Sequence, residues 1–312
     1  MKKFKLTIIL VSIFISLESR SQTDWSTVDF SKEYKVDTKI QGAVAKSLKS
    51  NPTFINDYTI VQASLMKGAS RAGTLQKQGV GSVFAEAALA GVSPDALQAL
   101  ISELYQGFVN ELNSAGLSVT DGESLLQTKY VVGKKKDKKA IIGKTDGTYI
   151  YDKSGPMGGS IKEQYLFRPK NVNVFTKPGV MGANFYQNLA SKEAVNLISI
   201  EYTIMFANFE GSKSGLSKNS LSTSAGLVIM PKIKLINPKG SFSWIVFEKN
   251  IDGNNDWSKG LIEKGSNDGS AFGLSSNADY AIEADQVKYI AELKSIILNL
   301  QKGIAKEIQA TF

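Results

Sequence analysis

Residues 196–208, which read NLISIEYTIMFAN, decide the fold class. Apolar residues occupy every second position from Ile198 to Phe206 and alternate with residues such as Glu201 and Thr203. Successive side chains of a strand point to opposite faces of a sheet. The alternation therefore predicts a long β-strand with Ile198 to Phe206 on the core side, whereas a helix would scatter these residues around its axis.

The following residues, up to Lys249, predict two more strands. Residues 225–236 resume the alternation, and Pro231 inside this run indicates an edge strand or a bulge, since proline cannot donate to a ladder. Residues 237–240, Asn-Pro-Lys-Gly, are typical of a tight turn. The returning run, residues 241–249, carries three apolar residues on one face: Phe242, Trp244 and Val246. An antiparallel meander of three strands is the simplest interpretation.

Two amphipathic helices are predicted to pack on this sheet, one near residues 94–115 and one at the C-terminus near residues 285–310. Ser93 and Pro94 suit the start of the first helix, and Gly116 suits its end. In the second helix the predicted apolar stripe is Val287, Ile290, Leu293, Ile297, Leu300, Ile304 and Ile308. The predicted fold is therefore α+β, sandwich-like, with an antiparallel sheet of long strands.

The N-terminus, residues 1–21, has the pattern of a secretory signal peptide. Lys2, Lys3 and Lys5 precede an apolar run, and Ser19 and Ser21 form a small-x-small pair before the expected cleavage site. The apolar run is short for a spanning helix, which needs about 20 apolar residues. No cysteine occurs at the junction, so the mature chain is not expected to be a lipoprotein. We therefore expect a periplasmic or secreted protein.

The remaining chain is predicted to form an arm and one domain. The polar residues 22–57 predict an extended arm with a short helix near residues 43–48, and residues 58–312 predict a single α+β domain. Two polar, Gly/Ser/Asn-rich stretches, 211–224 and 251–276, predict exposed loops. Residues 131–142 predict a lysine-rich hairpin between two short strands.

The composition excludes several kinds of chemistry. The chain has neither histidine nor cysteine, so a Ser-His-Asp triad, a thiol nucleophile and the usual zinc sites are absent. Removing residues 1–21 takes away four basic residues and one acidic residue, and lowers the formal charge from +8 to +5. That mild charge does not indicate a nucleic-acid partner.

One stretch follows the ligand order of a calcium loop: Asp252, Asn254, Asp256 and Glu263, which is the twelfth position. Trp257 stands at the sixth position, where such loops need glycine for a sharp turn, and a strand precedes the loop instead of a helix. An ordinary polar loop is therefore the main interpretation, with a structural calcium ion as the alternative. No other cofactor is expected.

The tip of the predicted hairpin carries five lysines: Lys134, Lys135, Lys136, Lys138 and Lys139. A charge run of this kind is usually a solvated surface. The functional alternative is contact with an acidic partner or with an anionic membrane surface.

The order of these segments resembles the bacterial envelope families that include the curli secretion lipoprotein CsgG and the amino-terminal domain of TolB. The resemblance rests on the strand of residues 195–206, on residues 233–240 with their turn, on Trp244, and on the helix and short strand of residues 97–119. It implies a sandwich-like domain used for protein contacts in the envelope. The chain lacks the lipidated cysteine and has an insertion at residues 211–224, which argues against pore formation.

The sequence therefore favours an exported, non-catalytic envelope protein that acts in protein binding, assembly or secretion, with envelope or secreted proteins as partners. One alternative is an oligomeric component of an outer-membrane secretion channel. The other is a glycan-active enzyme, which would use two Asp or Glu side chains.

Overall fold

The computed structural model describes residues 23–34, 36–39, 42–70, 83–120, 123–135, 141–153, 160–170, 172–176, 181–212, 220–267 and 276–311. The predicted signal peptide lies outside these residues, as do Lys136, Lys138 and Lys139 of the lysine run.

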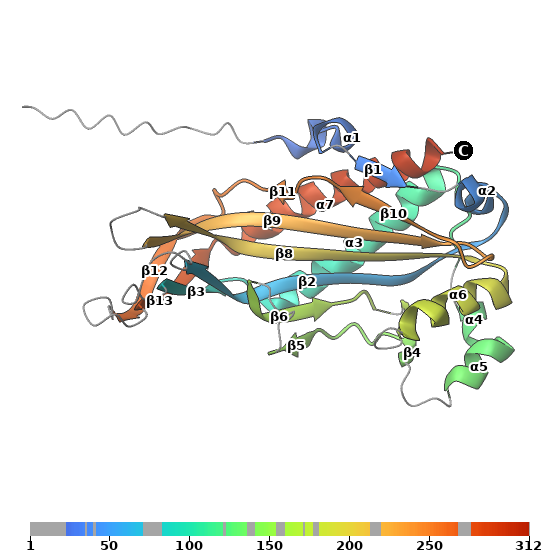
Figure 1. The fold of residues 1–312 in the computed structure, drawn as a ribbon, viewed down its shortest axis with the longest axis horizontal. Coiled ribbons are helices and arrows are strands. Elements are labelled where there is room, and N and C mark those ends of the chain that lie inside the picture. The colour runs from blue at the N-terminus through green and yellow to red at the C-terminus, as the bar shows by residue number, and fades with distance from the viewer. Residues whose placement is uncertain are drawn as a thin grey trace, which may run out of the picture.

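Within the described residues, one eleven-stranded sheet dominates the molecule (Figure 1). Its main path runs β1 (Val36–Lys39), β10 (Phe242–Phe247), β9 (Ser220–Ile236), β8 (Asn196–Ser212), β2 (Thr53–Ser70), β3 (Val83–Ala90), β13 (Ser276–Ala284) and β12 (Ser258–Asn267). Three strands lie off this path: β11 (Ile251–Asp252) pairs with β9, β6 (Ile161–Phe167) with β2, and β5 (Ile150–Asp152) with β6. A separate pair joins β4 (Ile141–Lys144) to β7 (Asn173–Thr176).

The α+β class and the antiparallel meander β8–β9–β10 are confirmed. Pro231 lies opposite Tyr202 of β8, in the interval of β9 between the residues that pair with β10 and those that pair with β11. The sheet as a whole is mixed: most of its strand pairs are antiparallel, as predicted, but two are not. Strands β2 and β8 run parallel, as do β3 and β13. The side chain of Asn196 ties the start of β8 to the start of β2, because its Nδ2 donates to Asn51 O (3.0 Å) and Thr53 Oγ1 (3.3 Å).

Two long helices cover one face of the sheet: α3 (Pro94–Ser114) and α7 (Gln286–Gln309) lie behind the sheet in Figure 1. Ser93 caps α3 by accepting a hydrogen bond from Asp95 N, and Gly116 adopts the left-handed conformation after its end, with φ of 90°. Both helices and the residues Ile198 to Phe206 on the core face of β8 belong to one hydrophobic core. In α7, Val287 is exposed and Tyr289 is buried, so the predicted stripe is wrong at its first position.

The prediction of an extended arm at residues 22–57 is wrong. This segment contains a short 3-10 helix, η1 (Trp25–Thr27), α1 (Phe30–Glu33), β1, α2 (Gly42–Ser50) and the start of β2. Trp25 and Phe30 are buried against the main core, and Trp25 Nε1 donates to Glu292 Oε1 of α7 at 2.7 Å. The predicted short helix is confirmed as α2. Trp25, Phe30, Val44 and Leu48 thus fold this otherwise polar segment onto the domain.

The described parts of the two predicted polar loops consist largely of strand, and residues 213–219 and 268–275 of these loops lie outside the described chain. Strand β8 continues to Ser212, β9 begins at Ser220, and β11, β12 and β13 occupy much of residues 251–284. Described residues of β8 after Ala207 and of β9 before Gly226 are exposed or half-buried. Polar composition is therefore compatible with strand here, because ladder hydrogen bonds hold these ends and the core needs few of their side chains.

A second, smaller core lies on the opposite face, at one end of the sheet. It joins α4 (Glu123–Leu126), α5 (Lys129–Lys135) and α6 (Met181–Glu193) to Phe54, Leu197 and Ile236 of the sheet. These three residues alternate with Ile55, Ile198 and Leu235 of the main core, which places the two cores on opposite faces. The rest of that opposite face, which carries side chains of β10, β9, β8 and β2 beyond the second core, is called the open face below. None of the helices in the described residues combines the length and apolar character needed to cross a lipid bilayer.

Candidate functional site

The four residues that follow the calcium-loop order do not come together in the structure. Asp252 ends β11 and Glu263 lies within β12, and the described residues contain no group of three or more acidic, histidine or cysteine side chains that could hold a metal ion. The Asn254 side chain instead exchanges hydrogen bonds with the backbone of Thr23, at 3.0 Å and 3.2 Å.

Trp257, which replaces the glycine of a calcium loop, is fully buried. Its ring packs edge-on against Tyr289 of α7, with ring centroids 5.0 Å apart. The Asn254 backbone N–H donates to Glu292 Oε1 at 2.8 Å, and the same oxygen accepts from Trp25. This segment therefore anchors the N-terminal residues and α7 to each other.

The prediction of a lysine-rich hairpin at residues 131–142 is also wrong in its first half. Lys134 and Lys135 end the helix α5. The strand β4, Ile141–Lys144, follows after residues 136–140, which lie outside the described part of the chain. Val131 is buried in the second core, and the Tyr130 ring stacks on Phe185 of α6 with centroids 6.0 Å apart. The Lys134 ammonium lies 5.9 Å from the Tyr130 ring centroid. Packing against α6 selects a helix where β-branched residues suggested a strand.

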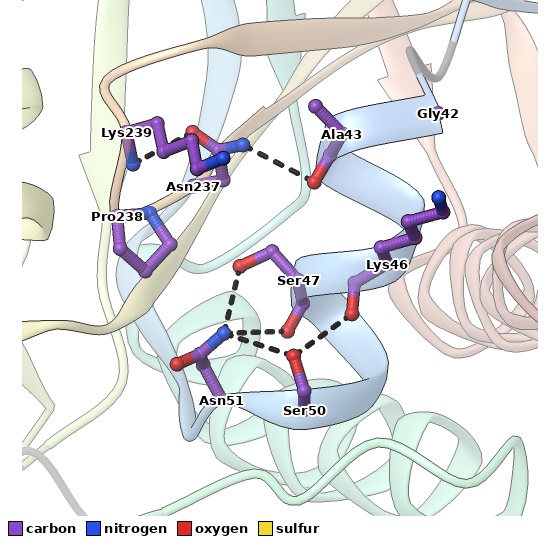
Figure 2. Close-up of a pocket in the computed structure, with 9 residues that line it drawn as sticks. All are labelled: Gly42, Ala43, Lys46, Ser47, Ser50, Asn51, Asn237, Pro238 and Lys239. Carbon is purple, nitrogen blue, oxygen red and sulfur yellow. Dashed lines mark hydrogen bonds between the residues drawn. The ribbon is translucent and has the colours of Figure 1, made fainter.

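A pocket of about 580 Å³ lies where α2 faces the turn between β9 and β10 (Figure 2). Its lining consists of Gly42, Ala43, Lys46, Ser47, Ser50, Asn51, Asn237, Pro238 and Lys239. We call it the α2 pocket. Asn237 joins its two sides, because its buried Nδ2 donates to Ala43 O at 3.3 Å while its Oδ1 accepts from Lys239 N and Ser241 N.

The wall formed by α2 is held from within. Asn51 Nδ2 donates to Ser47 Oγ and Ser50 Oγ, both at 3.1 Å (Figure 2). Ser47 Oγ donates to Asn196 Oδ1 at 2.6 Å, and Asn196 is fully buried. On the other side, Gln187 Nε2 of α6 donates to Gly240 O at 2.9 Å, where the turn adopts φ of 76°. The α2 wall is thus fixed to the start of β8, and the turn is fixed to α6.

The α2 pocket is electropositive by composition. Lys46 and Lys239 are its charged residues, and none of its nine lining residues is acidic. Figure 2 shows Lys239 extending from the turn toward α2, whereas the Lys46 side chain runs along α2 and its nitrogen points away from the turn. The sequence predicted the turn and the short helix separately, but it gave no sign that they face each other.

A second feature lies on the open face of β10. Phe242, Trp244 and Val246 share one face, as predicted, but they are 40–45% exposed, whereas Ser243 and Ile245 between them are buried. The Lys234 ammonium of β9 lies 5.2 Å from the Phe242 ring centroid and 5.3 Å from that of Trp244. We call Lys234, Phe242, Trp244 and Val246 the open-face patch. Burial among these side chains lowers the pKa of Lys234.

A charged row continues from the patch across β9, β8 and β2. Lys232 Nζ lies 2.9 Å from Glu201 Oε1, and Thr59 stands opposite Glu201 on β2. Thr59 Oγ1 donates to Asp57 Oδ1 at 2.7 Å and accepts from Arg168 Nε at 3.1 Å. Burial raises the pKa of Asp57 and the Glu201 charge adds to that effect, while the Thr59 hydrogen bond and Arg168 oppose it.

Comparison of the chain with protein-family models, curated proteins and solved structures found no match. The resemblance to the CsgG and TolB families therefore stays a prediction.

Proposed function

We propose that this chain is a non-catalytic protein-binding module, exported to the bacterial cell envelope, which holds an acidic, apolar polypeptide segment on its open-face patch. The observation that supports this proposal most directly is the patch itself. Three large apolar side chains of β10 are each 40–45% exposed on this face, and the Lys234 ammonium lies over the rings of two of them.

The charge of the patch supports an acidic partner. Lys232 is paired with Glu201, but Lys234 has no carboxylate partner among the described residues, and its ammonium lies over two aromatic rings. A partner carboxylate beside Lys234 would compensate for the burial that lowers its pKa. The formal charge of +5 that remains after removal of residues 1–21 favours the approach of acidic partners from solution.

The apolar part of the patch supports a polypeptide with apolar side chains. Aromatic residues are enriched among the few interface positions that carry most of the binding energy. Phe242 and Trp244 are also held in place, because their rings pack edge-on with centroids 6.3 Å apart. A flat strand surface with two fixed rings favours an extended segment, which can place alternate side chains on them.

The other parts of the proposal rest on the sequence. Export is supported by the signal-like residues 1–21, and a non-catalytic role by the lack of histidine and cysteine. The partner would accordingly be an envelope or secreted protein.

Tryptophan fluorescence tests this proposal directly. The other two tryptophans, Trp25 and Trp257, are buried, so a ligand at the open face should mainly affect Trp244. We expect a synthetic peptide of alternating Glu and Leu to shift and quench this emission, and a matched Lys-Leu peptide to have little effect. Trp244→Phe should remove the signal, and Phe242→Ala should weaken binding by about 30-fold, as for a typical hot-spot residue.

The control for charge is Lys234→Gln compared with Lys232→Gln. Lys234→Gln should weaken binding more, because Lys232 already has an acidic partner. Equal binding of the acidic and basic peptides, or equal effects of the two lysine substitutions, would contradict the proposal. A variant at a distant exposed residue, Val287→Ala, should bind like the parent protein.

A second candidate function is hydrolysis of glycans by carboxylates. Asp57 and Glu201 interact electrostatically, and the raised pKa of Asp57 is the property of a general acid. Release of reducing ends from envelope polysaccharides, lost in both Asp57→Asn and Glu201→Gln, would support this function over binding alone.

A further inference from the structure

We infer that the α2 pocket is a binding site for the phosphate group of a small phosphorylated molecule. The first argument is charge. Lys46 and Lys239 come from two different elements and flank one pocket, and the pocket lining contains no acidic residue. Neither lysine has an acidic partner among the described residues.

The residue types favour phosphate over a planar carboxylate. Arginine binds a carboxylate through its fixed fork of donors, and the pocket lining has no arginine. A lysine ammonium is a compact charge on a flexible stem, which suits the several oxygens of a phosphate group. Ser50 and Asn51 also line the pocket, but their hydroxyl and amide hydrogens are used within α2, so the two lysines supply the charge that recognises the ligand.

The pocket is also preorganised. Asn196 and Asn237 are almost fully buried, and their amides fix α2 to the start of β8 and to the β9–β10 turn. Binding therefore needs to order two lysine side chains and no backbone segment, which keeps the entropic cost of binding low.

The size of the pocket indicates a ligand larger than inorganic phosphate. Its volume of about 580 Å³ falls within the range of about 300–1,000 Å³ that is typical of small-molecule sites. Ala43 and Pro238 provide an apolar surface beside the lysines, where the organic part of such a ligand can pack.

This site is separate from the open-face patch. Val44 and Leu48 of α2 belong to the main core under α3 and α7, whereas the patch faces the opposite side of the sheet. Binding at one site can therefore fail while binding at the other is intact, and the inference does not depend on the proposed function.

The test uses glycerol phosphate as the soluble probe. Binding is measured by calorimetry and by the amide signals of residues 42, 43, 237, 239 and 240 in NMR spectra. We expect saturable binding with shifts confined to these residues, and weaker binding of inorganic phosphate. Lys46→Gln and Lys239→Gln should each weaken binding by about tenfold, the effect of losing one charge-assisted hydrogen bond. The matched control is Lys49→Gln, an exposed lysine of α2 outside the pocket lining, which should bind like the parent.

A parallel assay with phosphatidylglycerol vesicles separates two sources of the phosphate group. Binding of glycerol phosphate that depends on Lys46 and Lys239 would identify a soluble ligand, and vesicle binding with the same dependence but no soluble binding would identify a lipid headgroup. The inference is overturned if neither probe binds, or if Lys49→Gln weakens binding as much as the two pocket substitutions. Circular dichroism of each variant should match the parent, because the three side chains are exposed.

Discussion

The two faces of the sheet place the same residue type in opposite settings. Beneath α7, Trp257 is fully buried and packs on Tyr289, whereas Trp244 on the open face is 40% exposed beside Lys234. The alternation in the sequence shows that the two faces differ, but it does not show which face a helix covers. The covered face should therefore determine stability, and the open face should determine binding.

The largest expected effect comes from truncating the same residue type on each face. Trp257→Ala should lower the free energy of unfolding by about 3–5 kcal/mol, because it leaves a cavity under α7. Trp244→Ala should lower it by less than about 1 kcal/mol, because its ring is already partly in water. Urea unfolding followed by circular dichroism measures both values, and similar losses would contradict the assignment of the two faces.

A second comparison uses the polar groups buried on the covered face. Tyr289 Oη donates to Gln62 Oε1 at 3.0 Å, and burial raises the pKa of Tyr289, which keeps its hydroxyl protonated. Gln62→Leu should cost about 1–3 kcal/mol, because the buried hydroxyl loses its acceptor. Adding Tyr289→Phe should recover much of this loss, so the double variant should be more stable than the sum of the single variants predicts. A strictly additive double-mutant cycle would contradict this pairing.

The parts of the fold that the sequence predicted are those whose signals are local. The alternation from Ile198 to Phe206 and the capped stripe of α3 each lie within one element, and both are confirmed. The prediction of an extended arm at residues 22–57 failed because the burial of Trp25 depends on α7, which follows it by more than 260 residues. Strand β12 was predicted as a loop because its Gly, Ser, Asn and Lys composition is that of a loop. Its pairing with β13 makes it a strand.

The candidate sites follow the same rule. The turn at residues 237–240 and the helix α2 were both predicted, but the α2 pocket exists because Asn237 contacts Ala43, 194 positions away in the sequence. The shared face of Phe242, Trp244 and Val246 was also predicted. The exposure of this face was not predicted, because the sequence of one strand does not show which helices or sheets pack above it.

A third prediction concerns pH and the charged row of the open face. Because the pKa of Asp57 is raised above its ordinary value of 3.8, the folded protein binds this proton more tightly than the unfolded chain does. The contribution of Asp57 to stability is therefore full below the ordinary pKa and is lost as the pH rises through the raised value. We expect Asp57→Asn to be more stable than the parent at pH 7 and equal to it at pH 3. Asp279→Asn, at an exposed carboxylate of β13, is the control, and parallel stability curves for the parent and Asp57→Asn would contradict the prediction.

The smallest effects separate the two neighbouring lysines of β9. Lys232 and Glu201 lie directly opposite each other and remain largely exposed, so Lys232→Gln should cost no more than about 0.5 kcal/mol, and the loss should vanish in 1 M salt. Lys234→Gln should also change the free energy of unfolding by no more than about 0.5 kcal/mol. The variant loses the attraction to two aromatic rings, but it no longer buries a charge, and the two effects offset each other.

The Lys234 change should be insensitive to salt, since no carboxylate among the described residues pairs with this lysine. A salt-dependent loss of stability in Lys234→Gln would reveal an intramolecular acidic partner and remove the main reason for expecting an acidic ligand. If Lys234 contributes little to stability and much to peptide binding, the open face holds a charge that the fold itself does not need. That combination distinguishes a binding surface from an incompletely covered core, because leftover core positions lose stability when they are truncated and lose no affinity.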